Sequence, residues 1–259
     1  MVWQHGDMDL GLKDRAFVVS GASSGLGWAS AAELLRDGAS VVLCSRSQDR
    51  LEQAAARLDA GTRVRLVAGD LGDPLTTQRL IDVAGSAFGR LDGAVISVGG
   101  PPAGPVGGTD DDTWRASFET VFLGPLRLAR EVLAGGSDRA VTVILSTSVR
   151  APVPNLGVSN GLRPGLAGAL KTLADEYGPS GNRVNMLLPG RIDTDRITEL
   201  ESTAPDPAAF RAAMMTTIPL RRYGRPEELG RVAAFLTSPA ASYLNGVALA
   251  VDGGLTRSW

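Results

Sequence analysis

The chain is poor in the side chains that build metal centres and disulfides. Its 259 residues include one cysteine, Cys44, and one histidine, His5. A disulfide within the chain is therefore excluded, and zinc or iron sites made from clusters of Cys and His lack ligands. A nucleophilic Cys–His pair is disfavoured by the same shortage.

The sequence also has little net charge and no long apolar run. Its 26 Lys and Arg residues against 28 Asp and Glu give a formal net charge of −2, which disfavours a nucleic acid as partner. No uninterrupted apolar segment reaches the ~18 residues that span a bilayer. Residues 1–10 have neither a basic start nor an apolar signal core. We therefore expect a soluble, cytoplasmic protein that binds neither nucleic acid nor membrane.

Glycine, in contrast, is abundant, with 32 residues, and it clusters after short apolar runs rich in β-branched side chains. Such runs are typical of strands buried on both faces, and helical patterns follow them. This alternation predicts one α/β domain over residues 1–259, a Rossmann-type doubly wound sheet of seven mainly parallel strands with helices on both faces. The expected strands are 16–19, 41–43, 64–68, 93–98, 141–145, 184–188 and 247–251, and the expected helices are 25–37, 47–59, 75–88, 111–134, 159–178 and 226–237.

Two further segments have a pattern of their own. The expected helix 159–178 carries an apolar stripe at helical spacing, which indicates either packing on the core or a subunit interface. Residues 195–218 form the longest segment without an expected strand. We interpret this segment as a mobile substrate lid, with an ordinary surface excursion as the alternative. The stripe consists of Leu162, Leu166, Leu170, Leu173 and Tyr177.

A glycine-rich turn joins the first expected strand to an alanine-rich helix. Gly21 allows a tight turn, Gly25 lets the backbone approach a pyrophosphate, and Gly27 permits close helix packing. Free N–H groups at the start of the helix attract the anion. Because of its place between strand and helix, the turn predicts a dinucleotide site, the alternative being a merely structural turn. The expected contacts are Gly21, Ser23, Ser24, Gly25, Leu26 and Gly27.

Several motifs together resemble the short-chain dehydrogenase/reductase family over about residues 11–257. Besides the glycine turn, Asp70-Leu71 is similar to the family's adenine-contacting Asp, and residues 189–194 (PGRIDT) to its PGxIxT segment beside the nicotinamide. Residues 218–228 and 251–254 resemble the C-terminal pattern of its 3-oxoacyl-[acyl-carrier-protein] reductase branch. The resemblance implies cofactor contacts from Asp70, Leu71, Gly99, Pro189, Gly190, Ile192 and Thr194.

The same resemblance implies an oxidoreductase that acts on a small-molecule carbonyl or alcohol. It also implies a homotetramer or homodimer, joined through the helices 111–134 and 159–178. The substrate itself is not indicated, because the resemblance is strongest in the C-terminal pattern, and fold does not determine function.

The end of the second expected strand bears on the choice of cofactor. An acidic residue there would bind the ribose 2′-hydroxyl of NAD and repel a 2′-phosphate, but the chain has Cys44-Ser45-Arg46. Arg46 offers a donor fork suited to phosphate, so Ser45 and Arg46 favour NADP(H) over NAD(H). The alternative is that Arg46 is solvated and neutralised by Asp49 or Glu52.

The catalytic region departs from the family. Members usually have a Tyr followed four residues later by a Lys, a Ser thirteen residues before the Tyr, and an Asn on the preceding long helix. Alignment back from residues 173–179 places Ser159 at the Tyr position and Arg163 at the Lys position. Ser146 stands at the Ser position, whereas Val121 stands at the Asn position.

A shifted alignment does not restore the missing pair. Tyr177, Tyr223 and Tyr243 are followed four places later by Gly, Glu and Val, so the chain contains no YxxxK. The segment usually written NNAG is also changed, to residues 96–99 (ISVG), where Gly99 alone is kept. The expected catalytic residues are therefore Ser146, Ser159 and Arg163.

The residues present at the catalytic and cofactor positions support three hypotheses about function. The first is an NADP(H)-dependent oxidoreductase with an atypical site, in which Ser146 and Ser159 bond a developing alkoxide, Arg163 bonds the nicotinamide ribose, and Arg150 adds charge. Loss of the phenolic proton donor would cost ~10²–10⁴ in rate. The second is an NADP(H)-binding protein without turnover, acting as a sensor, scaffold or silent subunit. The third is non-redox chemistry, such as elimination or isomerisation, on the same fold.

Overall fold

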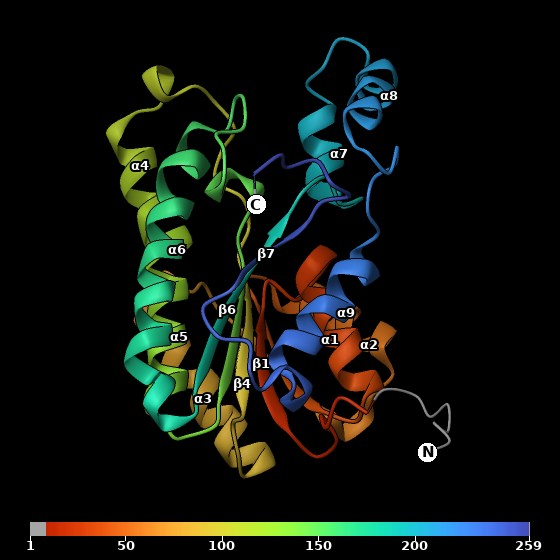
Figure 1. The fold of residues 1–259 in the computed structure, drawn as a ribbon. Coiled ribbons are helices and arrows are strands. Elements are labelled where there is room, and N and C mark those ends of the chain that lie inside the picture. The colour runs from red at the N-terminus through yellow and green to blue at the C-terminus, as the bar shows by residue number, and fades with distance from the viewer. Residues whose placement is uncertain (1–8, 259) are drawn as a thin grey trace, which may run out of the picture.

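The computed structural model describes residues 9–258, so His5 and most of the N-terminal segment considered above lie outside the described residues. Within this range, seven strands form one sheet in the order β3-β2-β1-β4-β5-β6-β7, and every neighbouring pair is parallel (Figure 1). The strands are β1 (Ala16–Ser20), β2 (Ser40–Ser45), β3 (Val64–Ala68), β4 (Gly93–Ser97), β5 (Ala140–Ile144), β6 (Arg183–Pro189) and β7 (Ala248–Val251). The predicted Rossmann-type fold is confirmed.

The apolar runs form strands because both faces of the sheet are covered. All five residues of β1 are buried, and successive side chains enter different cores. Val18 packs with residues of the helices on one face, whereas Phe17 and Val19 pack with residues of the helices on the other. Figure 1 shows α3, α5 and α6 on the first face and α1, α2 and α9 on the second. Each helix layer therefore holds one face of the sheet in place.

Helices begin where the sequence supplies an acceptor for the first free N–H groups. Ser47, Asp73, Asp110, Thr194 and Asp206 each accept a backbone N–H of the helix that follows. The helices are α1 (Gly25–Arg36), α2 (Gln48–Leu58), α3 (Pro74–Phe88), α4 (Asp111–Ser117), α5 (Gly124–Ala134), α6 (Gly157–Tyr177), α7 (Asp195–Glu201), α8 (Pro207–Thr217) and α9 (Pro226–Thr237).

The expected helix over 111–134 is not continuous. A π-helical segment, Phe118–Leu123, separates α4 from α5. Pro125 has no N–H to give to the carbonyl of Val121, so regular α-helical bonding cannot continue there. A Cβ at Gly124 would lie 2.6 Å from the carbonyl oxygen of Leu71, so glycine also lets the helix approach that loop closely. The prediction of one uninterrupted helix was wrong for this reason.

Two other expectations meet the structure in different ways. The side chains of Leu166, Leu170 and Leu173 lie in the core between α6 and the sheet, so core packing accounts for this part of the stripe. Leu162 is half-buried and lines an outer hollow, so a subunit interface stays a prediction there. Residues 195–218 contain α7 and α8, which stand above the carboxyl end of the sheet (Figure 1).

Over residues 9–258, none of the helices combines the length and the apolar character that crossing a membrane requires.

Candidate active site

A cleft of about 1700 Å³ lies at the carboxyl ends of the strands, below α7 and α8. Parallel α/β sheets bind ligands at this edge, where the strand order reverses, and here β1 has β2 on one side and β4 on the other. The cleft is lined by every predicted site residue except Gly27. The topology therefore brings together residues from 21 to 194 of the chain.

The glycine turn is shaped by backbone conformation. Gly21 and Gly25 have φ of +60° and +57°, values that side chains with a Cβ rarely adopt. A Cβ at Gly21 would lie 2.6 Å from the carbonyl oxygen of Ser97, and the Ser20 hydroxyl donates to that oxygen at 2.7 Å. A Cβ at Gly27 would collide with the carbonyl of Gly21, so Gly27 serves the packing of α1 rather than the cleft.

The start of α1 is suited to an anion. Ser24 is its N-cap and makes no side-chain bond to the first turn, so these N–H groups are left for another acceptor. The Arg57 guanidinium lies over the Trp28 ring and donates to the Ser23 carbonyl at 3.2 Å. A cradle of this kind fits the pyrophosphate of a dinucleotide.

The adenosine end of the cleft carries exposed positive charge. Arg46 follows β2 and is exposed, and within residues 9–258 it forms no ion pair with Asp49 or Glu52. Glu52 instead accepts from the Gln48 amide at 2.8 Å. Arg50 also lines the cleft and donates to the Ser24 hydroxyl at 3.4 Å. Sequence reasoning missed Arg50, although its place in the first turn of a helix after Arg46 was a usable signal.

Asp70 and the residues after β6 line the same cleft. The Asp70 carboxylate accepts the Gly72 N–H at 2.8 Å, which fixes its orientation. A Cβ at Gly190 would lie 2.6 Å from that of Asp252, so only glycine allows β6 to end this close to the C-terminal segment. Thr194 caps α7 and lies close to Gly25, which places the two predicted motifs on either side of one channel.

The predicted catalytic serines come from β5 and α6. Ser146 follows β5, and its Oγ accepts the Ser148 N–H at 3.0 Å, so its own proton is available to donate. Ser159 lies buried in the first turn of α6, and its Oγ is 3.3 Å from that of Ser148. Within the described residues, the structure has no hydrogen bond between Ser146 and Ser159. Ser148, which is not among the predicted site residues, is thus the partner of Ser159.

Arg163 enters the cleft from α6 and is only 5% exposed. Its Nη1 donates to the carbonyls of Leu145 at 2.9 Å and Ile144 at 3.3 Å, whereas its Nε has no hydrogen-bond partner in residues 9–258. Burial, and then the charge of Arg196, lower the pKa of Arg163 to about 10. The guanidinium therefore remains cationic at neutral pH.

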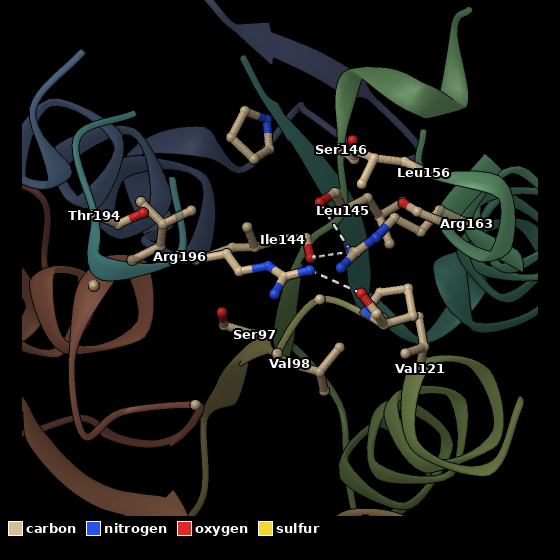
Figure 2. Close-up of a pocket in the computed structure, with 18 of the residues that line it drawn as sticks. Ser97, Val98, Val121, Ile144, Leu145, Ser146, Leu156, Arg163, Thr194 and Arg196 are labelled. Atoms are coloured by element: carbon tan, nitrogen blue, oxygen red, sulfur yellow. Dashed lines mark hydrogen bonds between the residues drawn. The ribbon is translucent and has the colours of Figure 1, made fainter. Parts of the chain in front are cut away.

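Arg196 approaches from the opposite side, on α7 (Figure 2). Its Nη2 donates to the Pro101 carbonyl at 2.8 Å, and its Nη1 pairs with Glu199 at 3.0 Å. The side chain thus connects the predicted lid to the loop after β4. Sequence reasoning missed Arg196, because it considered this segment as a lid and did not search it for charged groups.

The remaining groups limit what chemistry the site can perform. Val121, from the π-helical segment, is buried and lines the cleft. In the described part of the chain, no tyrosine lines the cleft. Burial, and then a hydrogen bond to Glu201, raise the pKa of Tyr223 to about 12, and burial raises that of the Cys44 thiol to about 12. Neither group ionises near neutral pH.

The predicted lid is anchored at one point. Glu201, at the end of α7, is buried, and it accepts a hydrogen bond from the Tyr223 hydroxyl. Arg211 of α8 pairs with Glu201 at 3.3 Å and with Asp193 at 2.9 Å, and Arg191 lies 3.5 Å from Glu201. This cluster fixes the base of α7 and α8. Mobility of the segment stays a prediction.

Comparisons with known proteins agree with this architecture. A family model described as enoyl-(acyl carrier protein) reductase matches residues 21–256. The chain is 36% identical over 250 residues to cis-4-hydroxycyclohexanecarboxylate dehydrogenase of Sinomonas cyclohexanicum, covering 94% of this chain and 97% of that protein. It is 35% identical to human dehydrogenase/reductase SDR family member 2, mitochondrial, covering 95% and 88% respectively.

Solved structures give the same result. L-sorbose reductase from Gluconobacter frateurii, complexed with NADPH and L-sorbose, superposes with a TM-score of 0.90 at 30% identity, covering 97% of this chain and all of that one. The fold of the chain is therefore that of a known group of enzymes. The chain belongs to the short-chain dehydrogenase/reductase family of oxidoreductases.

Proposed function

We propose that this protein is an NADP(H)-dependent oxidoreductase that interconverts a carbonyl and an alcohol in a small molecule, with an atypical active site. The observation that carries the proposal is one continuous cleft, which joins the glycine turn and Arg46 to Ser146 and Arg163. The similarity to an L-sorbose reductase complexed with NADPH supports the choice of cofactor.

The residues of the adenosine end fit this cofactor. Gly25 and the first N–H groups of α1 bind the pyrophosphate, because no side-chain cap takes these N–H groups, while Gly21 lets the turn pack against the Ser97 carbonyl. Arg46 and Arg50 bind the 2′-phosphate with charge-assisted hydrogen bonds. Asp70 accepts from the adenine, and the contacts from Pro189 to Thr194 hold the nicotinamide side. The bound cofactor supplies or accepts the hydride.

The serine end binds the reacting oxygen. The Ser146 hydroxyl donates a hydrogen bond to that oxygen, since the Ser148 N–H already occupies a lone pair of its Oγ. In the direction of reduction, the alkoxide takes its proton from solvent water; in the direction of oxidation, the alcohol gives its proton to water. Arg163 is held rigidly by two carbonyls and lines the cleft, where its guanidinium contacts the ribose or the substrate. Orientation and hydrogen bonding then provide most of the catalysis, and the missing phenol costs the ~10²–10⁴ that a general acid contributes.

A second candidate is an NADP(H)-binding protein without turnover. It is favoured by the bond between Ser159 and Ser148, which turns the residue at the family's Tyr position toward another serine. Such a protein would bind NADPH as tightly as an enzyme does, so cofactor affinity alone does not separate the two candidates.

The test is a calorimetric titration with NADPH and with NADH, followed by turnover assays. We expect micromolar binding of NADPH and much weaker binding of NADH. L-sorbose and 4-oxocyclohexanecarboxylate, the oxidised form of the relative's substrate, are the first compounds to offer. Absence of binding to either cofactor would overturn the proposal, whereas binding without turnover of any carbonyl would favour the second candidate.

We also propose a homodimer or homotetramer formed through the outer surface of α4, the π-helical segment and α6. A hollow of about 560 Å³ there is lined by Trp114, Phe118 and Leu162, and Phe118 stacks on Phe122 with ring centroids 4.9 Å apart. Apolar hollows of this kind are typical of interfaces. Gel filtration showing only a 26.9 kDa species would contradict this proposal.

A further inference from the structure

We propose that the serine end of the cleft selects substrates that carry a carboxylate, and that Arg196 binds it together with Arg163. The inference rests on the proposed function in that the carboxylate belongs to the molecule whose carbonyl or alcohol reacts. It names a class of substrate and a specificity-determining residue, Arg196, that lies outside the motifs of the sequence analysis.

The first observation is the charge of the cleft. The chain as a whole is nearly neutral, yet the residues lining the cleft are strongly cationic. Arg46 and Arg50 have a role toward the cofactor phosphate, and Arg191 lies 3.5 Å from Glu201. The excess positive charge that matters at the other end is therefore that of Arg163 and Arg196. The charged lining residues are Arg46, Arg50, Arg150, Arg163, Arg191, Arg196 and Arg257 against Asp70, Asp195 and Glu199.

The second observation is the unpaired state of Arg163. A buried guanidinium is costly unless an anion and full hydrogen bonding compensate it. Arg163 forms no ion pair in residues 9–258, and its Nε has no hydrogen-bond partner. The two carbonyls that it contacts are neutral dipoles and do not balance its charge. An anion entering the cleft would supply what the protein itself leaves out.

The third observation is the placement of Arg196. Figure 2 shows the side chains of Arg163 and Arg196 extending from opposite sides toward the middle of the cleft. Two like charges that face each other repel, and the charge of Arg196 adds to burial in lowering the pKa of Arg163. An anion between them turns that repulsion into two attractions. A carboxylate matches the planar donor edge of a guanidinium.

The partner that Arg196 now has is replaceable. Glu199 lies one turn away on α7 and is 70% exposed, and ion pairs of this type contribute little. A substrate carboxylate can take its place, while the bond from Nη2 to the Pro101 carbonyl holds the guanidinium over the cleft. Arg196 is therefore positioned before any ligand arrives.

The rest of the lining defines the body of the substrate. Val98, Val121, Leu145 and Leu156 border the same region with apolar side chains (Figure 2). An oxo or hydroxy acid with a compact hydrocarbon body matches this combination of apolar wall and cationic centre better than a polyhydroxylated neutral sugar does.

The experiment compares two probes of equal shape, cyclohexanecarboxylate and cyclohexanecarboxamide, by calorimetry on the protein with and without NADPH. We expect the carboxylate to bind ~10- to 100-fold more tightly, the range for one charge-assisted hydrogen bond. Arg196→Gln should remove this preference, and Arg196→Lys should keep part of it. Arg231→Gln, on the exposed face of α9 outside the cleft, is the matched control and should bind both probes like the wild type.

Three results would overturn the inference: equal binding of the two probes, no detectable binding of either, or a preference that Arg196→Gln leaves intact. Thermal unfolding of each variant shows that it is folded. The proposed function is tested separately by turnover. Carboxylate binding without turnover of any carbonyl leaves the anion site standing and counts against the enzyme, whereas equal reduction of 4-oxocyclohexanecarboxylate and its carboxamide overturns the anion site and supports the enzyme.

Discussion

The two ends of the cleft are built on different principles. At the adenosine end, recognition depends on backbone: Gly21 and Gly25 adopt positive φ, and α1 presents its first N–H groups. At the serine end it depends on buried side chains, where Ser159 contacts Ser148 and Arg163 contacts two carbonyls. The first end keeps the family pattern and the second departs from it. A cofactor site can thus persist while the chemistry beside it changes.

The charged side chains of the two ends also differ in their exposure to solvent. Arg46 and Arg50 are exposed, so solvent screens them until a phosphate binds. Arg163 is buried and Arg196 partly so, and their repulsion is not screened to the same extent. The serine end therefore stores unfavourable electrostatic energy that an anionic ligand releases. Each prediction below changes one end and measures the property that depends on that end.

The largest effect should come from Ser146, and Ser159 serves as its comparison. Ser146→Ala removes the hydroxyl that donates to the reacting oxygen, and kcat should fall ~10²–10³-fold, as for the loss of one oxyanion donor. Ser159→Ala should lower kcat less than ~3-fold, because its hydroxyl bonds Ser148 rather than Ser146. Steady-state kinetics at saturating NADPH measures both.

The affinity for NADPH serves as the control for that pair and should be unchanged in both variants. If Ser159→Ala proves as damaging as Ser146→Ala, the two serines act as a unit, and the orientation of Ser159 in the structure does not describe the working site.

The next effect concerns the adenosine end alone. Gly21→Ala forces a Cβ to within 2.6 Å of the Ser97 carbonyl at φ +60°, so the turn must shift. A displacement of this order should raise the Kd for NADPH ~10²-fold. The left-handed conformation should also cost about 1–2 kcal/mol in the free energy of unfolding. Calorimetry and chemical denaturation measure these changes.

Gly85→Ala in α3 is the matched control. A Cβ there meets no atom within 4 Å, so helix propensity should stabilise the protein by about 0.5–1 kcal/mol and leave NADPH binding intact. Tight NADPH binding by Gly21→Ala would show that the turn tolerates a side chain, and that the glycine is needed only for folding.

A smaller effect should follow from reversing the charge at Arg46. Arg46→Asp removes a charge-assisted bond to the 2′-phosphate and restores the acidic side chain that suits NADH, so NADPH affinity should fall ~10- to 100-fold while NADH affinity rises. The ratio of the two dissociation constants is the measurement. An unchanged ratio would assign cofactor choice to Arg50 instead, and Arg50→Ala would test that.

The glycine turn and the strand order could be predicted from sequence because each depends on local properties. A glycine that requires positive φ, such as Gly21, is recognisable whatever surrounds it, and buried strands are recognisable by their apolar runs. The π-helical segment was not predicted because two factors together cause it. Pro125 lacks an N–H, and Gly124 lies against the Leu71 carbonyl. Only the second of these depends on tertiary structure.

The serine end was harder to predict for a physical reason. Sequence spacing does not determine the orientation of side chains. It therefore could not show that Ser159 contacts Ser148, or that the Nε of Arg163 has no partner among the described residues. Arg196 lies 33 residues beyond Arg163 in the sequence, and only the return of α7 over the sheet brings their charges together. Sequence spacing identified which residues reach the cleft but not how they pair.

The smallest expected effect is a flat pH profile. A phenolic catalyst loses activity as it ionises, whereas Ser146 has no ionisation near neutral pH, and the pKa values of Cys44 and Tyr223 are raised to about 12. The lowered pKa of Arg163, about 10, makes it the group that titrates first. Below that pH Arg163 is cationic and active, and above it the charge is lost.

For a carboxylate substrate, kcat/KM should thus be constant from about pH 6 to 9 and decline as pH rises through about 10. A parallel measurement of NADPH affinity over the same pH range reports on the adenosine end separately. A decline centred between pH 6 and 9 would reveal a proton donor other than these residues, and the serine end would then resemble the rest of its family more closely than its side chains indicate.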